Sequence, residues 1–195
     1  MKEALLEGDI VIAKARVRDA ADIANILLAA WLYTYPNEEY QITEADVRKK
    51  FGEIDRRIIG INRFLDSTQS NTTITYLVAQ LKAEISGFIY CIKTQDNLNI
   101  NSLYVHPKYH RLGIGSSLLR EGIILNPGIN HATLDVVSYN TQAIAFYRRH
   151  DFVIQGPSQT PFSQFPDGKT IPEIRMIRAC SDTRNNQHIL CSSSQ

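Results

Sequence analysis

Two glycines near the middle of the chain, Gly113 and Gly115, follow an apolar run at 103–105 and precede a helix-like pattern. The stretch 106–119 reads HPKYHRLGIGSSLL. Glycine allows a tight turn and lets the main chain come close to a ligand. A helix that begins there presents unpaired N–H groups and the positive end of its dipole. The pattern therefore predicts a binding site for an anion such as phosphate or pyrophosphate.

A second candidate segment, residues 140–147, reads NTQAIAFY. Asn140 can cap the helix that begins at the next residue, or it can hydrogen-bond a ligand. Ala143 is small enough for a ligand to approach, and ordinary helix packing explains it equally well. Tyr147 carries a phenol that can protonate a leaving group; the alternative is a core aromatic packed at the helix end.

In their order and separation the two segments resemble the GNAT family of acyl-CoA-dependent N-acetyltransferases, most strongly from about Leu98 to Phe152. The family's phosphate loop reads Gln/Arg-x-x-Gly-x-Gly/Ala, and this chain has His110 in the first position. The family's second motif has an Asn, then an Ala, then Phe-Tyr near a helix end, as 140–147 does.

The resemblance implies an acyltransferase that uses acetyl-CoA as cosubstrate and acetylates an amine. Pantetheine is expected along strand 103–105, as in strand addition, with the Val105 N–H polarising the thioester carbonyl. Tyr147 is the expected catalytic residue, as the acid that protonates the departing thiolate. The expected cofactor-binding residues are Leu103, Tyr104, Val105, His110, Arg111, Leu112, Gly113, Ile114, Gly115, Ser116, Ser117, Asn140, Ala143 and Tyr147.

Three positions depart from the family pattern: His110 in the loop, Asp151 where a Gly is common, and Asn99 where many members carry a Glu. The Asn99 departure removes an obvious general base, although an alkylammonium acceptor must lose a proton before it attacks. His106, Asp135 or a water held by Asn99 or Asn101 are open alternatives. The residues expected to bind the acceptor are Trp31, Tyr35, Asn99 and Asp135.

The elements that position these residues follow from periodicity and turn signals. Strands are predicted at 10–16, 73–80, 84–93, 98–105, 132–138, 152–155 and 173–178. Helices are predicted from Asp19, which serves as the cap, over 43–64 with Thr43 and Asp46 as a capping box, after the glycine loop to 125, and over 141–150. The fold class is mixed α/β: a mostly antiparallel central sheet with one parallel, splayed strand pair, flanked by helices.

Length and composition bound the remaining possibilities. The 195 residues fit one domain, 1–180, followed by a polar tail, 181–195. A net charge of +1 argues against nucleic acid as the main partner. Three cysteines without ligand spacing give no support for a metal site, and no apolar run is long enough to span a membrane. A cytoplasmic protein is therefore expected, and a homodimer is left open.

Two other functions compete with acetyl transfer. The missing Glu leaves a non-catalytic acyl-CoA-binding sensor as the alternative. A dinucleotide-binding oxidoreductase is disfavoured because Leu118 stands where Gly-x-Gly-x-x-Gly needs its third glycine. The sequence does not identify the acceptor amine, which can belong to a small molecule or to a protein.

Overall fold

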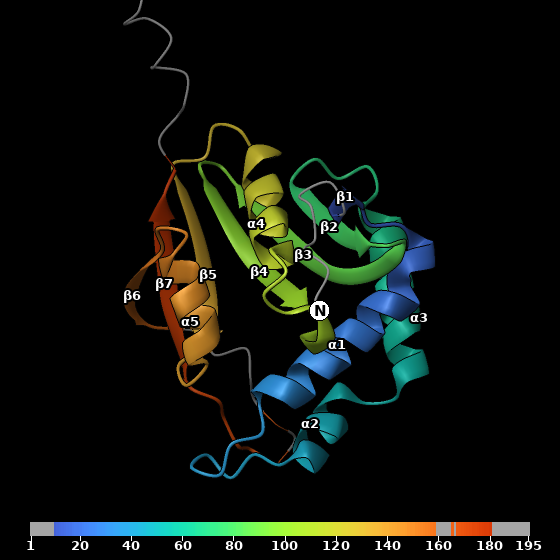
Figure 1. Ribbon diagram of the computed structural model, residues 1–195, viewed down its shortest axis with the longest axis vertical. Coiled ribbons are helices and arrows are strands. Elements are labelled where there is room, and N and C mark those ends of the chain that lie inside the picture. The colour runs from blue at the N-terminus through green and yellow to red at the C-terminus, as the bar shows by residue number, and fades with distance from the viewer. Residues whose placement is uncertain (1–9, 159–164, 166, 181–195) are drawn as a thin grey trace, which may run out of the picture.

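A computed structural model describes residues 10–158, 165 and 167–180. Its strands form one sheet in the order β1-β2-β3-β4-β5-β7-β6 (Figure 1). The strands are β1 (Ile10–Lys14), β2 (Ile74–Leu81), β3 (Glu84–Thr94), β4 (Asn97–Val105), β5 (His131–Val137), β6 (Val153–Pro157) and β7 (Glu173–Ala179). The helices are α1 (Ala20–Thr34), α2 (Glu44–Phe51), α3 (Ile54–Thr68), α4 (Ile114–Ile124) and α5 (Thr141–Arg148), with short 3-10 turns η2 (Val17–Asp19) and η3 (Pro107–Tyr109).

The mixed α/β class is confirmed, because β4 and β5 run parallel while the other paired strands of the described chain are antiparallel. Helices α4 and α5 cover one face of the sheet and bury the largest apolar cluster, around Leu118, Leu134 and Tyr147. On the other face, α1 and α3 enclose a second cluster around Ile23, Leu65 and Phe88. Because helices cover both faces of the sheet, a binding site is expected at the ends of the strands, between the two cores.

Strands β4 and β5 pair only near their beginnings. The register joins Asn97 to His131, Leu98 to Ala132 and Asn99 to Thr133, and it ends there. Beyond that point β4 remains paired with β3 as far as Val105, whereas β5 continues along β7. Figure 1 shows the two strands diverging as a V from the top of the view downward. Beyond this point, the main-chain N–H and C=O groups on the facing edges of β4 and β5 have no strand partner in the described chain.

A third apolar cluster joins the two arms at the open end of the V. It contains Trp31 and Tyr35 from the end of α1, Val47 and Phe51 from α2, and Val137 from the end of β5. Burial of these side chains fixes the α1–α2 region against the β5–β7 arm.

Two local predictions are wrong. The expected single helix over 43–64 is two helices, because Gly52 adopts a positive φ of 76° and ends α2. The expected cap of α1 by the Asp19 side chain also fails, since that carboxylate accepts the main-chain N–H of Arg16, at 2.8 Å, within η2. The capping box of Thr43 and Asp46 is confirmed at the start of α2.

Candidate active site

The glycine loop before α4 has the backbone that an anion site needs. Arg111 and Gly113 both lie in the left-handed region, with φ of 65° and 82°. Gly113 is the N-cap of α4 and supplies no side chain to cap it. Because the first helical N–H bonded within α4 is that of Ser117, to the Gly113 carbonyl, the preceding N–H groups have no helical partner. These donors fit a pyrophosphate, which the dipole of α4 also favours.

The open edge of β4 offers main-chain groups to the same side. The N–H of His106 donates to Ser86 of β3 at 2.9 Å. Since alternate residues of a strand point their main-chain groups in opposite directions, those of Leu103 and Val105 point into the V. The ring of His110 turns back to this edge, with Nε2 3.0 Å from the Val105 carbonyl oxygen. The Val105 N–H therefore faces the V, while its carbonyl is engaged by the loop.

Tyr147 reaches toward the V from the α5 side. Its side chain is 7% exposed and packs in the main cluster beside Phe146 and Phe152. Its hydroxyl has no hydrogen-bond partner among the described residues, and its oxygen is not fully buried. Burial raises the pKa of Tyr147 well above its usual value, and nearby Tyr104 adds to the effect. The phenol is therefore protonated at neutral pH, as a proton donor must be.

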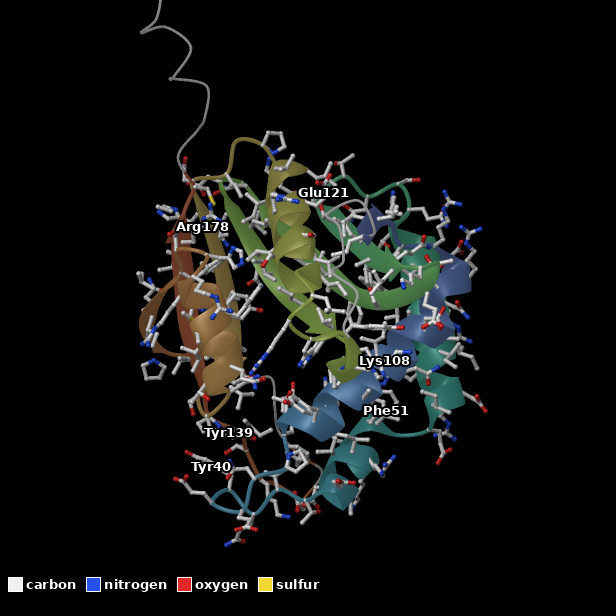
Figure 2. The ribbon with its side chains drawn as sticks, viewed as in Figure 1. Tyr40, Phe51, Lys108, Glu121, Tyr139 and Arg178 are labelled. Atoms are coloured by element: carbon white, nitrogen blue, oxygen red, sulfur yellow. The ribbon has the colours of Figure 1, made fainter. Side chains whose placement is uncertain are left out.

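Tyr104 reaches the V from the opposite face. Its hydroxyl accepts the Trp31 Nε1–H at 3.2 Å and shares a hydrogen bond of 3.2 Å with the Tyr35 hydroxyl. Trp31 and Tyr35 are 5% and 6% exposed. In this structure their polar groups therefore bond to Tyr104 rather than facing the V directly. Their expected role in lining the acceptor pocket stays a prediction. Near the open end, the rings of Tyr40 and Tyr139 stack at 5.2 Å, toward the bottom of Figure 2.

Asn140 and Ser116 both make contacts within the protein. The Asn140 side chain accepts the Ala143 N–H at 3.0 Å and caps α5, which confirms the capping alternative. The Ser116 hydroxyl lies 2.9 Å from Nε2 of His150, a residue the sequence reasoning did not select. Burial lowers the pKa of His150, and the nearby Arg178 and Arg149 add to the effect, which favours the neutral ring. His150 follows α5 and reaches the first turn of α4 only through tertiary structure, 34 residues along the chain from Ser116.

Residues 72–154 match the family described as the acetyltransferase (GNAT) domain. The chain is therefore similar to the GNAT family over this segment. It is 26% identical over 148 residues, 68% of its own length and 97% of the relative, to the peptidyl-lysine N-acetyltransferase YjaB of Salmonella typhimurium. Together these findings make the protein an acyltransferase enzyme, and the family supports acetyl transfer from acetyl-CoA.

Solved structures agree on the fold. The PaiA N-acetyltransferase of Thermoplasma acidophilum, in complex with coenzyme A, superposes with a TM-score of 0.67 at 23% identity, over 88% of this chain and 99% of that one. The ribosomal-protein-S18-alanine N-acetyltransferase of Escherichia coli gives 0.61 at 18% identity, over 91% and 97%. Both likenesses confirm the GNAT-like architecture of helices around a splayed sheet.

The remaining candidates of this GNAT domain lie near the closed end of the V. Asn99 belongs to the last β4–β5 pair. Asp135 forms two hydrogen bonds with Arg175 of β7, at 3.0 and 2.7 Å, so its carboxylate is held by a cation. Within the described ranges no group of three or more His, Cys, Asp or Glu could hold a metal ion. None of the helices described there is long and apolar enough to cross a membrane.

Proposed function

We propose that this protein transfers the acetyl group of acetyl-CoA directly to a primary amine of a small molecule or protein, within a ternary complex. The observation that carries the proposal is the divergence of β4 and β5 beyond Asn99 and Thr133, next to a helix start with unpaired N–H groups. The divergence opens the sheet to both faces. The donor is expected from the α4–α5 side and the amine from the α1 side.

The binding of acetyl-CoA is assigned to the loop and to the edge of β4. Main-chain N–H groups from Arg111 to Ser116 face the pyrophosphate, and Ser117 adds a hydroxyl. Leu103 and Val105 direct their main-chain groups into the V, where they can pair with the amides of pantetheine. Acetyl-CoA supplies the acetyl group as a thioester. The Val105 N–H is proposed to polarise the carbonyl of that thioester.

Tyr147 is proposed as the general acid. The neutral amine forms a bond to the acetyl carbon, the carbon–sulfur bond breaks, and the sulfur takes the phenolic proton. The proton that the amine nitrogen loses passes to solvent, from which the phenolate is reprotonated. A buried phenol with a raised pKa keeps that proton at neutral pH until a thiolate forms beside it. Its free hydroxyl supports the assignment, because no described neighbour competes for the proton.

The proposal extends to the domain organisation. We infer that residues 1–180 form a single acetyltransferase domain, because the strands from β1 to β7 belong to one sheet. The family match covers the part of that sheet from β2 to the start of β6. Strands β4 and β5 lie within the matched segment, whereas β7, which supports the β5 arm of the V, lies beyond it. The acceptor site is therefore proposed to need the whole domain.

The deciding experiment measures CoA release from acetyl-CoA with a panel of amines, alongside calorimetric binding of acetyl-CoA. The panel includes alkylamines, amino acids and a lysine-containing peptide, since the Salmonella relative carries a peptidyl-lysine name. Saturable CoA release that depends on the amine supports the proposal. If acetyl-CoA binds and no amine is acetylated, the transfer proposal is wrong and the sensor alternative returns.

A further inference from the structure

The first turn of α4 carries a side-chain hydroxyl beside the main-chain N–H groups that are assigned to the pyrophosphate. Ser116 is the third residue after the N-cap, Gly113. Because side chains on a helix lean toward its N-terminus, the Ser116 hydroxyl lies at the end of α4 where the unpaired N–H groups are. What this hydroxyl can offer an anion depends on its partner, His150, whose Nε2 lies 2.9 Å from Ser116 Oγ.

Packing fixes the imidazole of His150 in this contact. His150 follows α5, and its main-chain N–H donates to the Tyr147 carbonyl at 2.9 Å. Its ring lies 4.7 Å from the ring of Phe146, centroid to centroid. Phe146 in turn packs against α4, since a Cβ built at Gly115 would lie 3.4 Å from two of its ring carbons. The end of α5 and the first turn of α4 are therefore joined at two consecutive residues, Gly115 and Ser116.

The hydrogen bond between Ser116 and a neutral His150 can form in two ways. A serine hydroxyl has one proton and two lone pairs, and a neutral imidazole has one N–H and one acceptor nitrogen. In the first arrangement Ser116 donates to Nε2, and its proton is no longer available to a ligand. In the second, the Nε2–H of His150 donates to the Ser116 oxygen, and the hydroxyl proton is free. A diphosphate at the start of α4 favours the second arrangement, because its oxygens accept hydrogen bonds.

Protonation of His150 has the same effect as the anion. A cationic ring permits the second arrangement alone, because both of its nitrogens carry protons. Burial lowers the pKa of His150, Arg178 of β7 and Arg149 at the end of α5 lower it further, and Asp151 opposes them. The cationic ring is thus disfavoured by desolvation and by two positive charges. Negative charge on a nearby diphosphate would offset both and raise this pKa.

We propose that His150 is a positioning residue of the acetyl-CoA site: its Nε2–H donates to the Ser116 oxygen and so directs the hydroxyl proton to the pyrophosphate. The inference rests on the proposed binding of acetyl-CoA and adds a pair of side chains to the main-chain donors. Because binding and protonation favour each other, acetyl-CoA raises the pKa of His150. By the same factor, a cationic His150 tightens the binding of acetyl-CoA.

The first test follows the ring of His150 by NMR over a pH titration of the wild-type protein, with and without saturating acetyl-CoA. Its signal is identified as the one that is missing from His150→Gln. Coupling between two binding events is typically about fivefold or more, which corresponds to a rise of about 0.7 in the pKa of His150. Ser116→Ala removes the hydroxyl and leaves the ring, so the rise should be smaller in that variant.

The second test compares the Kd of acetyl-CoA for the wild type and His150→Gln by calorimetry. The glutamine amide can donate to Ser116 as Nε2–H does, but it cannot become charged. At about pH 8 the two proteins should bind within about twofold of each other, because the wild-type ring is then neutral. At about pH 5 the wild type should bind about threefold more tightly. Comparing the proteins at one pH cancels the titration of the ligand's own phosphates.

His131→Gln is the matched control, because His131 is exposed at the start of β5, where it pairs with Asn97. It removes a titrating imidazole and should not change the Kd at either pH. His150→Asn carries the amide on an arm one carbon shorter, out of reach of Ser116. It should therefore bind acetyl-CoA more weakly than His150→Gln at about pH 8, and thermal unfolding of each variant checks that it is folded.

Four results overturn the inference while leaving the proposed function intact. They are a pKa of His150 that acetyl-CoA does not raise, a rise of the same size in Ser116→Ala, the same pH dependence of Kd in the wild type and His150→Gln, and equal binding by His150→Asn and His150→Gln. A wild type that does not bind acetyl-CoA refutes the proposed function, and the inference with it. Binding by the wild type therefore distinguishes the two failures.

Discussion

Asn99 of β4 and Thr133 of β5 are the last two residues that the parallel strands pair. Two residues earlier on β4, Asn97 donates from its side-chain amide to the Thr133 hydroxyl at 3.0 Å, which closes this end of the V with polar contacts. Beyond the pair the arms are held apart by different partners, β3 on one side and β7 on the other. The divergence of β4 and β5 is thus built into the strand register.

Tyr147→Phe tests the proposed acid. The variant removes one oxygen and leaves the packing against Phe146 and Phe152 in place. A general acid contributes about 10²- to 10⁴-fold, so kcat should fall at least 100-fold. Acetyl-CoA affinity should stay within about twofold, as measured by calorimetry. A variant with near wild-type turnover would make Tyr147 a packing residue.

Gly87→Ala tests the close approach of β3 to the open strand. A Cβ built at Gly87 would lie 2.8 Å from the Tyr104 carbonyl oxygen and 3.2 Å from a Val105 methyl carbon, so β4 has to move. Overpacking of this kind costs about 1–3 kcal/mol, and the shift should also weaken acetyl-CoA binding. Urea unfolding and calorimetry report the two effects.

Gly60→Ala is the matched control for that variant. Gly60 lies within α3, and a Cβ there would meet nothing within 4 Å. Alanine should therefore stabilise the protein by about 0.5–1 kcal/mol through helix propensity, with unchanged acetyl-CoA affinity. If both variants have the same effect, the contact between β3 and β4 is not the cause.

Asp151→Gly should stabilise the protein. Asp151 follows α5 with a φ of 65°, a conformation that glycine adopts without steric cost. Removing the strain of a left-handed non-glycine residue should raise the free energy of unfolding by about 0.5–1 kcal/mol. Asp151→Ala keeps the strain and loses the polar side chain, so it should not stabilise. Thermal unfolding of the two variants side by side provides the measurement.

Local features of this fold were readable from the sequence because local residues determine them. The glycine loop, the Asn140 cap and the Thr43–Asp46 box each depend on residues within one turn of each other. The break at Gly52 was missed because charged residues on both sides continue a helical pattern, and one left-handed glycine outweighs that pattern.

The surroundings of the site were harder to predict from the sequence, since they depend on strand registers between segments that are far apart in the chain. The pairing of Asp135 with Arg175 spans 40 residues and removes a base candidate that looked free in the sequence. Glu173 lies opposite Val137 only because β7 enters the sheet between β5 and β6. Neither relationship leaves a periodic signal, so neither could be predicted from spacing.

Thr43→Ala tests the link between the α2 cap and acid stability. The Thr43 N–H and hydroxyl both donate to Asp46, at 2.9 and 2.7 Å, and with Lys169 they hold the pKa of Asp46 at about 2. Because this pKa lies below the unfolded value, Asp46 contributes stability that is present above about pH 4 and is lost as the pH falls toward 2.

Losing the hydroxyl should cost about 1 kcal/mol at neutral pH, as loss of an N-cap does. It should also raise the pKa of Asp46 part of the way to its usual value, because the main-chain donor and Lys169 remain. The Asp46 carboxyl chemical shift, followed between about pH 1.5 and 6, would give its pKa in the wild type and in the variant for comparison with the usual value of an aspartate. Thr72→Ala, at an exposed turn, is the control and should change neither quantity. An unchanged Asp46 titration in Thr43→Ala would mean that the hydroxyl does not set this pKa.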